Sequence, residues 1–298
     1  MHGGSPRARI AIIGTGLMGS GVAKRLSSQG FDLTLWNRTR EKAEHLASAI
    51  GARIAGSPHE AVEGAEVAIA FLADDEALIQ VASSLKRADG LVFINASTTT
   101  PRANAYTSSY MEGLGACFLE GPVVGGPEAA SRGDLISIVA GRDSCFKRAI
   151  HVINSYSKKV IYLGDEIGKA SALKLAFNSV LITTQALLAE AMRLVDAYGV
   201  SHEDFKTLLG ETVFREVSGK YYDRMLSDEW PVGFRLSMAA KDLEYARRAA
   251  FDAGFSPATI SVAGSIYSLA AQVMGQEDYS RIYQFLKRLS RGSKPGET

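Results

Sequence analysis

The chain has 298 residues, with 33 lysines and arginines against 32 aspartates and glutamates, and a formal net charge of +1. This length suits one large domain or two ordinary ones, and 46% hydrophobic and 22% charged residues are typical of a soluble globular protein. The near-neutral charge argues against nucleic-acid binding, and the two cysteines are too few for a disulfide framework or a four-cysteine metal site.

Short apolar runs alternate with helical patterns through the first half of the chain. Strands that alternate with helices predict a mainly parallel α/β sheet with right-handed crossovers. We expect the first strands at residues 8–14, 31–36, 67–72 and 91–95, and the helices between them at 17–30, 40–50 and 75–86. Later runs at 118–120, 136–140 and 159–162 are expected to join the same sheet, which gives a first domain over residues 1–164.

The pattern becomes wholly helical after residue 164. Residues 168–197 contain no internal glycine or proline, and at about 1.5 Å per residue such a helix is long enough to join two domains. We expect an all-helical second domain over residues 165–298, with a frayed tail from about residue 290. Ser201 and Ser256 are predicted N-caps, and Gly199 and Gly254 are predicted helix ends. The further helices are expected at 202–209, 214–226, 237–253, 257–274 and 279–289.

Several kinds of site and partner are not expected. No apolar run reaches the roughly 18–20 residues of a membrane span, so we expect no membrane partner. The cytoplasm is the expected location, with a single disulfide left open, and Cys117 and Cys145 are interpreted as small buried side chains rather than nucleophiles. The five histidines are scattered without metal-ligand spacing, so no metal site is expected.

A glycine motif lies where the first predicted strand ends and the first helix begins. Its first glycine permits a tight turn, the second lets the backbone approach a pyrophosphate, and the third lets helix and strand pack closely. The helix N-terminus adds unpaired N–H groups and a positive dipole. The motif therefore predicts a Rossmann-type dinucleotide site, the alternative being a tight turn without a ligand. The motif reads Gly14-Thr15-Gly16-Leu17-Met18-Gly19.

The end of the second predicted strand indicates which nucleotide binds. An NAD site usually carries Asp or Glu here for the ribose, but this segment reads Asn37-Arg38-Thr39 and has no acidic residue before Glu41. Arg38 can pair with a 2′-phosphate and stack on adenine. The sequence thus favours NADPH/NADP+ as the cofactor, the alternative being that Arg38 is a solvated charge. Leu72, at the end of a strand, is a further expected cofactor contact.

Polar and glycine-rich segments follow later strands and open the long helix. Ser97 follows a predicted strand, at the carboxyl edge where such sheets bind ligands. Gly125 and Gly126 could direct backbone N–H groups at a carboxylate. Lys174 and Asn178 are four residues apart in the long helix and so share one face, with Ser171 one turn earlier. A Lys241-Asp242-Leu243 segment lies in a later helix.

Together these motifs resemble the β-hydroxyacid dehydrogenase family, which includes 3-hydroxyisobutyrate dehydrogenases and glyoxylate or succinic semialdehyde reductases. The resemblance implies a Rossmann domain followed by an all-helical domain, an active site in the cleft between them, and a homodimer or homotetramer. It further implies that Lys174 is the general acid/base and that Asn178 orients it. Ser97, Gly125 and Gly126 would hold the substrate carboxylate, with Ser171 nearby. Lys241 would lie beside the cofactor and the substrate.

The chemistry of hydride transfer agrees with these roles. Hydride delivery to a carbonyl builds negative charge on oxygen, so a nearby proton donor such as Lys174 lowers the barrier. Each of these residues also has an interpretation without a role in catalysis or binding. Lys174 would then be a surface lysine, Lys241 and Asp242 a solvated charge pair, and Ser97 part of a helix-capping turn.

The chain departs from the family pattern at two points. Members commonly carry Asp before the Ser-Thr pair, where this chain has Asn95 and Ala96. Their second loop commonly reads Ala-Pro-Val-Ser-Gly-Gly, whereas Gly121 and Val124 stand in the Ala and Ser positions here.

We therefore expect an NADP(H)-dependent oxidoreductase acting on a small carboxylated aldehyde or ketone, or on the corresponding 3-hydroxyacid. Glyoxylate and succinic semialdehyde are the candidate substrates. One alternative is an imine reductase of the same superfamily, although those enzymes generally lack a lysine at the position of Lys174. Another is a non-catalytic NADPH-binding scaffold, because function depends on sites rather than on folds.

Overall fold

The computed structural model describes residues 8–291. It divides into two compact units, the first ending at Leu175 and the second beginning at Ala176. This division lies eleven residues after the predicted boundary, because Ala170, in the first turn of the long helix, packs with Ile138 and Ala140 of the first unit.

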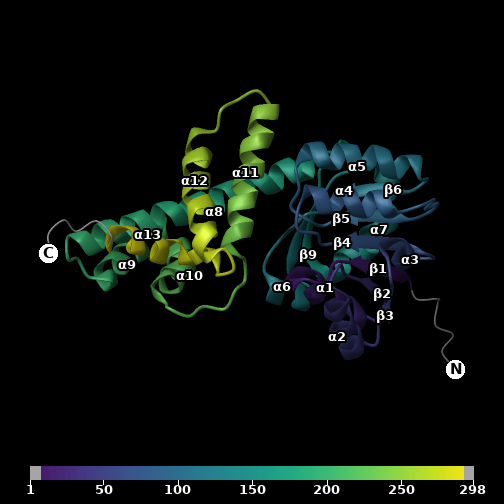
Figure 1. Cartoon of the computed structure of the whole chain (residues 1–298), viewed down its shortest axis with the longest axis horizontal. Helices are drawn as coiled ribbons and strands as arrows, with labels where there is room; N and C mark the ends of the chain where they lie inside the picture. Colours follow the sequence, from purple (N-terminus) through teal and green to yellow (C-terminus); the bar gives the residue numbers. More distant parts are fainter. Residues whose placement is uncertain (1–7, 292–298) are drawn as a thin grey trace. The chain divides into compact units, whose positions relative to one another are not determined.

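The first unit is built on a six-stranded parallel sheet with the strand order β3-β2-β1-β4-β5-β6 (Figure 1). This confirms the predicted Rossmann-type α/β fold. The strands are β1 (Arg9–Ile13), β2 (Asp32–Trp36), β3 (Arg53–Ile54), β4 (Val67–Ala70), β5 (Val92–Asn95) and β6 (Cys117–Glu120). The helices between them are α1 (Leu17–Ser28), α2 (Arg40–Ile50), α3 (Pro58–Val62), α4 (Asp75–Ser84) and α5 (Pro101–Gly113).

The sheet is buried on both faces, as the continuous apolar runs require. Ile10 and Ile12 of β1 pack into one core cluster, which includes side chains of α1 and α2. The alternate residues Ala11 and Ile13 pack into another cluster, with α3, α4 and α5. Because successive side chains of a strand point to opposite faces, β1 contributes to both clusters.

Of the three later runs, residues 118–120 join this sheet within β6, as predicted, whereas the strands after β6 do not, which corrects the expectation for residues 136–140 and 159–162. The strands after β6 form a separate three-stranded sheet of β7 (Val123–Val124), β8 (Leu135–Val139) and β9 (Ser157–Tyr162), with α6 (Pro127–Arg132) and α7 (Asp143–Tyr156) between them. β7 pairs antiparallel with β8, and a single antiparallel bridge between Glu120 and Ala140 links the two sheets. A short apolar run specifies a buried strand but neither its direction nor its partner.

The two cysteines are joined. Cys117 begins β6, Cys145 lies in α7, and a disulfide connects them with their Cα atoms 5.7 Å apart. The interpretation of the two cysteines as separate thiols is therefore wrong, and the single disulfide that the sequence left open is confirmed.

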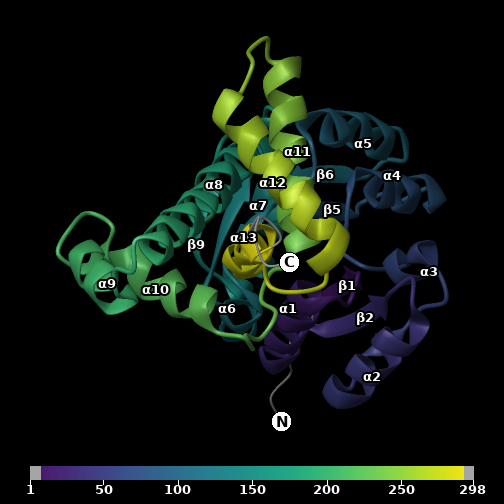
Figure 2. The same ribbon diagram turned by 60° about the vertical axis from the view of Figure 1, so that its left-hand side comes forward.

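The second unit is helical throughout the residues that the structure describes. Its elements are the part of α8 (Lys169–Ala197) from Ala176 onward, α9 (His202–Gly210), α10 (Arg215–Leu226), α11 (Leu236–Asp252), α12 (Ala258–Met274), the short 3-10 helix η1 (Tyr279–Arg281) and α13 (Ile282–Arg291). Helices α11 and α12 lie side by side as a hairpin (Figure 2).

Of the two predicted N-caps, one is confirmed and the other is wrong. Ser201 caps α9 by accepting a hydrogen bond from the Asp204 N–H, which confirms that N-cap. Ser256 is not a cap, because Pro257 occupies the N-cap position of α12 without a side-chain hydrogen bond. The frayed tail expected from about residue 290 lies mostly outside the described residues.

Helix α8 corrects the expectation that no segment has the length and hydropathy of a membrane span. An 18-residue window of this helix reaches a mean hydropathy of 1.4. Its side chains Ile182, Ala189 and Met192 are nevertheless fully buried in the core of the second unit. The core helix of a soluble protein meets the same test of length and hydropathy, and α8 contributes these three side chains to the core of the second unit.

Candidate active site

The glycine turn after β1 is as tight as its pattern predicts. A Cβ on Gly14, whose φ is +98°, would lie 2.3 Å from the Phe71 carbonyl oxygen. A Cβ on Gly19 would lie 2.0 Å from the carbonyl oxygen of Gly14. Only glycine permits this close approach of α1 to the two strand ends.

The middle of the turn is open where a ligand would approach. A Cβ on Gly16 would meet no atom within 4 Å. Gly16 is the N-cap of α1 and provides no side-chain hydrogen bond, and the first turn holds no acidic residue. The buried hydroxyl of Thr15 has no partner within residues 8–291. Unpaired donors at a helix N-terminus fit the pyrophosphate of a dinucleotide.

The segment after β2 contains two residues with different roles: Asn37 joins two loops, and Arg38 is an exposed cation. Asn37 accepts a hydrogen bond from the Thr15 N–H at 3.0 Å and donates to the Thr39 carbonyl at 2.8 Å, so it holds the two loops together. Arg40 pairs with Glu44 at 2.8 Å. Arg38 is exposed and forms no ion pair within the described part of the chain.

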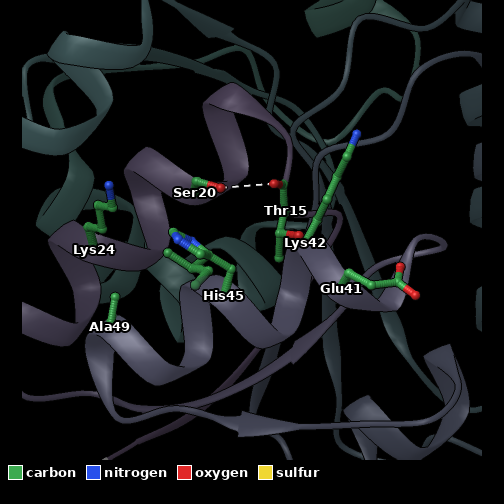
Figure 3. Close-up of a pocket in the computed structure, with 8 residues that line it drawn as sticks. Thr15, Ser20, Lys24, Glu41, Lys42, His45 and Ala49 are labelled. Carbon is green, nitrogen blue, oxygen red and sulfur yellow. Dashed lines mark hydrogen bonds between the residues drawn. The ribbon is translucent and has the colours of Figure 1, made fainter.

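A groove of about 400 Å³ opens between α1 and α2 beside this turn (Figure 3). Thr15 lines it together with the cationic side chains Lys24 and Lys42 and with His45. Sequence reasoning missed Lys42, although its position one turn after Arg38, at the start of α2, was a usable signal.

Ser97 has a different bonding pattern from the one its predicted role requires. Its hydroxyl accepts a hydrogen bond from the Leu72 N–H at 2.8 Å and donates its proton to the Ala70 carbonyl at 3.2 Å. Ser97 and Leu72 therefore fasten the loops after β4 and β5 to each other. In this arrangement the hydroxyl can accept a further hydrogen bond but cannot donate one to a carboxylate.

The departure at Asn95 has a structural reason. Its Nδ2 donates to Thr99 and to Asn104, both at 2.8 Å, while its Oδ1 accepts from the Ser97 N–H at 3.1 Å. An ionised aspartate has no donor for the first two bonds, so the amide fits this buried network as it stands.

The glycine loop after β6 combines a crowded glycine with an open one. A Cβ on Gly121 would lie 2.5 Å from Ile94 Cγ2, which explains the glycine at the position where the family that the sequence resembles commonly has alanine. Gly125 has a φ of +133°, whereas a Cβ on Gly126 would meet nothing within 4 Å. Among the described residues, the N–H groups of Gly125 and Gly126 have no acceptor. Val124 packs beside the apolar cluster of Ile138, Ala140 and Ala170.

The start of α8 is held by a buried carboxylate. Glu120 accepts hydrogen bonds from the N–H groups of Gly168 at 2.8 Å, Ala170 at 3.2 Å and Ser171 at 3.3 Å. The Ser171 hydroxyl donates to the Gly168 carbonyl at 3.1 Å, so this side chain serves the helix end. Lys174 follows one turn later and is 8% exposed.

Asn178 is anchored by a residue that the sequence indicated only as part of a charge pair. Its Nδ2 donates to Asp242 Oδ2 at 2.6 Å, and both residues are buried. The Lys241 ammonium lies 3.0 Å from the other carboxylate oxygen of Asp242 and 4.7 Å from the centre of the Tyr245 ring. Lys174 and Asn178 belong to one continuous helix, so they share a face one turn apart.

Family models match nearly the whole chain. One described as the NAD binding domain of 6-phosphogluconate dehydrogenase matches residues 9–164, and one described as NAD-binding of NADP-dependent 3-hydroxyisobutyrate dehydrogenase matches residues 168–286. The chloroplastic glyoxylate/succinic semialdehyde reductase 2 of Arabidopsis thaliana is 30% identical over 289 residues, covering 93% of this chain and 79% of that protein.

Solved structures share the fold. The 3-hydroxyisobutyrate dehydrogenase of Mycobacterium tuberculosis with L-serine superposes with a TM-score of 0.84 at 24% identity, covering 94% of this chain and 99% of that one. A reductive aminase from Aspergillus terreus in complex with NADPH and ethyl levulinate gives a TM-score of 0.65 at 24% identity and the same coverage. With both halves matched in order, the chain belongs to the β-hydroxyacid dehydrogenase family of nicotinamide-nucleotide-binding oxidoreductases.

Proposed function

We propose that this protein is an NADPH-dependent reductase of small carboxylated aldehydes or ketones, and in the reverse direction a 3-hydroxyacid dehydrogenase. The observation that carries the proposal is the arrangement on α8, where the buried Lys174 lies one turn before an Asn178 held by Asp242. When bound, the cofactor supplies the hydride, and the protein has to supply position and the proton.

Lys174 is assigned the proton transfer. As the carbonyl carbon gains the hydride, negative charge develops on its oxygen, and an N–H of the Lys174 ammonium donates the proton that completes the alcohol. In the reverse direction the neutral amine takes that proton back. Asn178 donates to Asp242, so its amide nitrogen is anchored and its Oδ1 is left as an acceptor for the neighbouring turn.

The turn after β1 and the residues after β2 are assigned to NADPH. The open space at Gly16 and the unpaired first turn of α1 suit the pyrophosphate. Arg38 and Lys42 are the cations proposed for the 2′-phosphate, because Arg40 is already paired with Glu44.

The substrate carboxylate is assigned to the N–H groups of Gly125 and Gly126. The sequence interpretation also included Ser97 among the residues that hold the carboxylate. Ser97 is left out here because its hydroxyl donates its proton to the Ala70 carbonyl. Glyoxylate and succinic semialdehyde remain the proposed substrates.

An imine reductase is the second candidate. Val124 provides methyl groups where the family commonly has a serine hydroxyl, and Ser97 donates elsewhere, so this side of the site has few donors for a carboxylate. Lys174 argues for the first candidate, since a cationic proton donor suits a carbonyl oxygen.

Turnover decides between the two candidates. NADPH and NADH oxidation would be followed with glyoxylate, succinic semialdehyde, methylmalonate semialdehyde and a cyclic imine. The proposal expects turnover of a carboxylated aldehyde with NADPH, and a selective loss of NADPH affinity in Arg38→Ala but not in the matched control Arg40→Ala. Turnover of the imine alone supports the second candidate, whereas NADPH binding without any turnover supports a scaffold.

We also propose that the chain forms a homo-oligomer. Val180, Leu187 and Leu194 recur every seven residues along α8 and are 70%, 64% and 61% exposed. An apolar stripe of this spacing on one helix face is typical of a surface that a second copy covers. Light scattering of the wild type and of Leu187→Glu tests it: the wild type should exceed the mass of one chain, and the variant should shift toward it.

A further inference from the structure

Glu120 is a buried carboxylate in an unusual place. It is the last residue of β6 and has no exposed surface. Its two oxygens together accept three backbone N–H groups from residues 168–171, which are about fifty positions further along the chain. Burial raises the pKa of this carboxyl, and hydrogen bonds from Ser171, Gly168 and Ala170 oppose the rise.

These hydrogen bonds supply what a helix start lacks. The first N–H groups of any helix have no partner within the helix and need an acceptor from elsewhere. A local residue usually provides it, but here the acceptor comes from a strand of the parallel sheet. A carboxylate at this position also interacts favourably with the helix dipole.

The same residue joins three parts of the first unit. The Glu120 backbone exchanges hydrogen bonds at 2.9 and 3.2 Å with Ala140, the residue that follows β8 of the second sheet. The chain then enters the glycine loop through Gly121, which is packed against Ile94. The Glu120 side chain therefore holds the first residues of α8 next to the place where the proposed carboxylate-binding loop begins.

We propose that Glu120 is a positioning residue for Lys174: it sets the start of α8, and with it the place of the Lys174 ammonium relative to the Gly125–Gly126 loop. Lys174 follows Ala170 by one helical turn, and its own N–H bonds back to that turn in a regular helix. The role of Lys174 in this statement rests on the proposed function, whereas the cap itself does not.

The test uses Glu120→Gln, which keeps the size of the side chain. Glutamine has one acceptor oxygen and an NH2 group, so at least one backbone N–H of α8 faces a donor instead of an acceptor. Glu128→Gln is the matched control, because Glu128 lies in the first turn of α6 and its side chain is 92% exposed. Glu120→Asp, which retains both acceptor oxygens on a shorter stem, serves as the conservative variant.

Two readouts are measured for each variant in the full chain: amide hydrogen exchange of residues 168–175, and kcat and KM with the Kd for NADPH. We expect faster exchange over these residues in Glu120→Gln alone. We also expect a fall in kcat of roughly ten- to a hundredfold, the effect of a misplacement of about 1 Å, with NADPH affinity essentially unchanged. Glu120→Asp should recover part of the loss.

Three results overturn the proposal. They are unchanged exchange at residues 168–175, unchanged kcat despite faster exchange, and a loss of NADPH binding with faster exchange across the whole chain, which would mark general destabilisation. If the wild type reduces no carbonyl compound, the proposed function fails instead, and exchange at the Lys174 amide alone decides whether Glu120 positions this residue.

Discussion

Alanine at Gly16 and alanine at Gly19 should have opposite effects, because the two glycines serve different purposes. Gly16 has φ −70° and ψ −170°, which alanine adopts readily, and its Cβ would meet no protein atom within 4 Å. Gly16→Ala should therefore leave the fold intact or raise the free energy of unfolding by about 0.4–1 kcal/mol, since alanine restricts the unfolded chain. Its methyl group would instead occupy the space assigned to the pyrophosphate.

The cost at Gly16 should appear in binding. Losing one hydrogen bond to a charged group costs about 1.5–3 kcal/mol, which corresponds to a rise in the Kd for NADPH of roughly ten- to a hundredfold. In Gly19→Ala the Cβ would lie 2.0 Å from the Gly14 carbonyl oxygen. Relieving that overlap costs about 1–3 kcal/mol of stability or more, whether or not a nucleotide is present.

Thermal melting and NADPH fluorescence titration of both variants separate these effects. Gly16→Ala should melt like the wild type and bind weakly, and Gly19→Ala should melt several degrees lower. The reasoning is refuted if Gly16→Ala binds NADPH as tightly as the wild type, because the pyrophosphate would then lie elsewhere.

Three further outcomes are expected. Asp242→Ala should lower kcat on the order of tenfold by removing the acceptor of the Asn178 amide, and it should have no further effect in an Asn178→Ala background; additive losses in this double-mutant cycle would contradict the coupling. Reduction of the Cys117–Cys145 disulfide should lower the free energy of unfolding by about 3–4 kcal/mol, as estimated from a separation of 28 residues. Melts with and without dithiothreitol measure this, and a Cys145→Ala variant should not respond to the reductant. Burial alone would raise the pKa of the Asp196 carboxyl, but hydrogen bonds from Tyr283 and Arg193 outweigh burial, so this pKa is lowered. A lowered folded-state pKa contributes stability at neutral pH that is lost as pH falls below about 4, so melting temperatures should fall more steeply with acid in the wild type than in Asp196→Asn. Parallel slopes would contradict this role.

Local sequence patterns were sufficient for most of the fold and for the glycine turn. The strands of the parallel sheet are continuous apolar runs, and the Gly14–Gly19 motif lies at a strand end, so both depend on neighbouring residues alone. The sequence interpretation omits α7, although its buried residues Ala149, Val152, Ile153 and Tyr156 recur at helical spacing. That omission also concealed the disulfide, because one of its cysteines lies in this helix.

The features that the sequence did not predict depend on distant partners. Glu120 directly precedes the glycine loop in the sequence, and nothing in its neighbours indicates that it accepts a hydrogen bond from Gly168. A solvated charge pair is one of two sequence interpretations of Lys241 and Asp242, but Asp242 is 2% exposed and holds Asn178, 64 residues away. Ser97 lies where it was predicted, but the proton of its hydroxyl is committed to Ala70, which only the packing of two strand ends determines.

The central claim is that Lys174 transfers the proton during reduction of a carboxylated carbonyl compound. The direct measurement is the rate of NADPH oxidation by Lys174→Ala with the best aldehyde, beside Lys169→Ala, an exposed lysine of the same helix that pairs with Glu166. We expect a loss of kcat of about 10²–10⁴-fold in Lys174→Ala with NADPH affinity retained, and wild-type rates in Lys169→Ala. Wild-type turnover by Lys174→Ala would contradict the account.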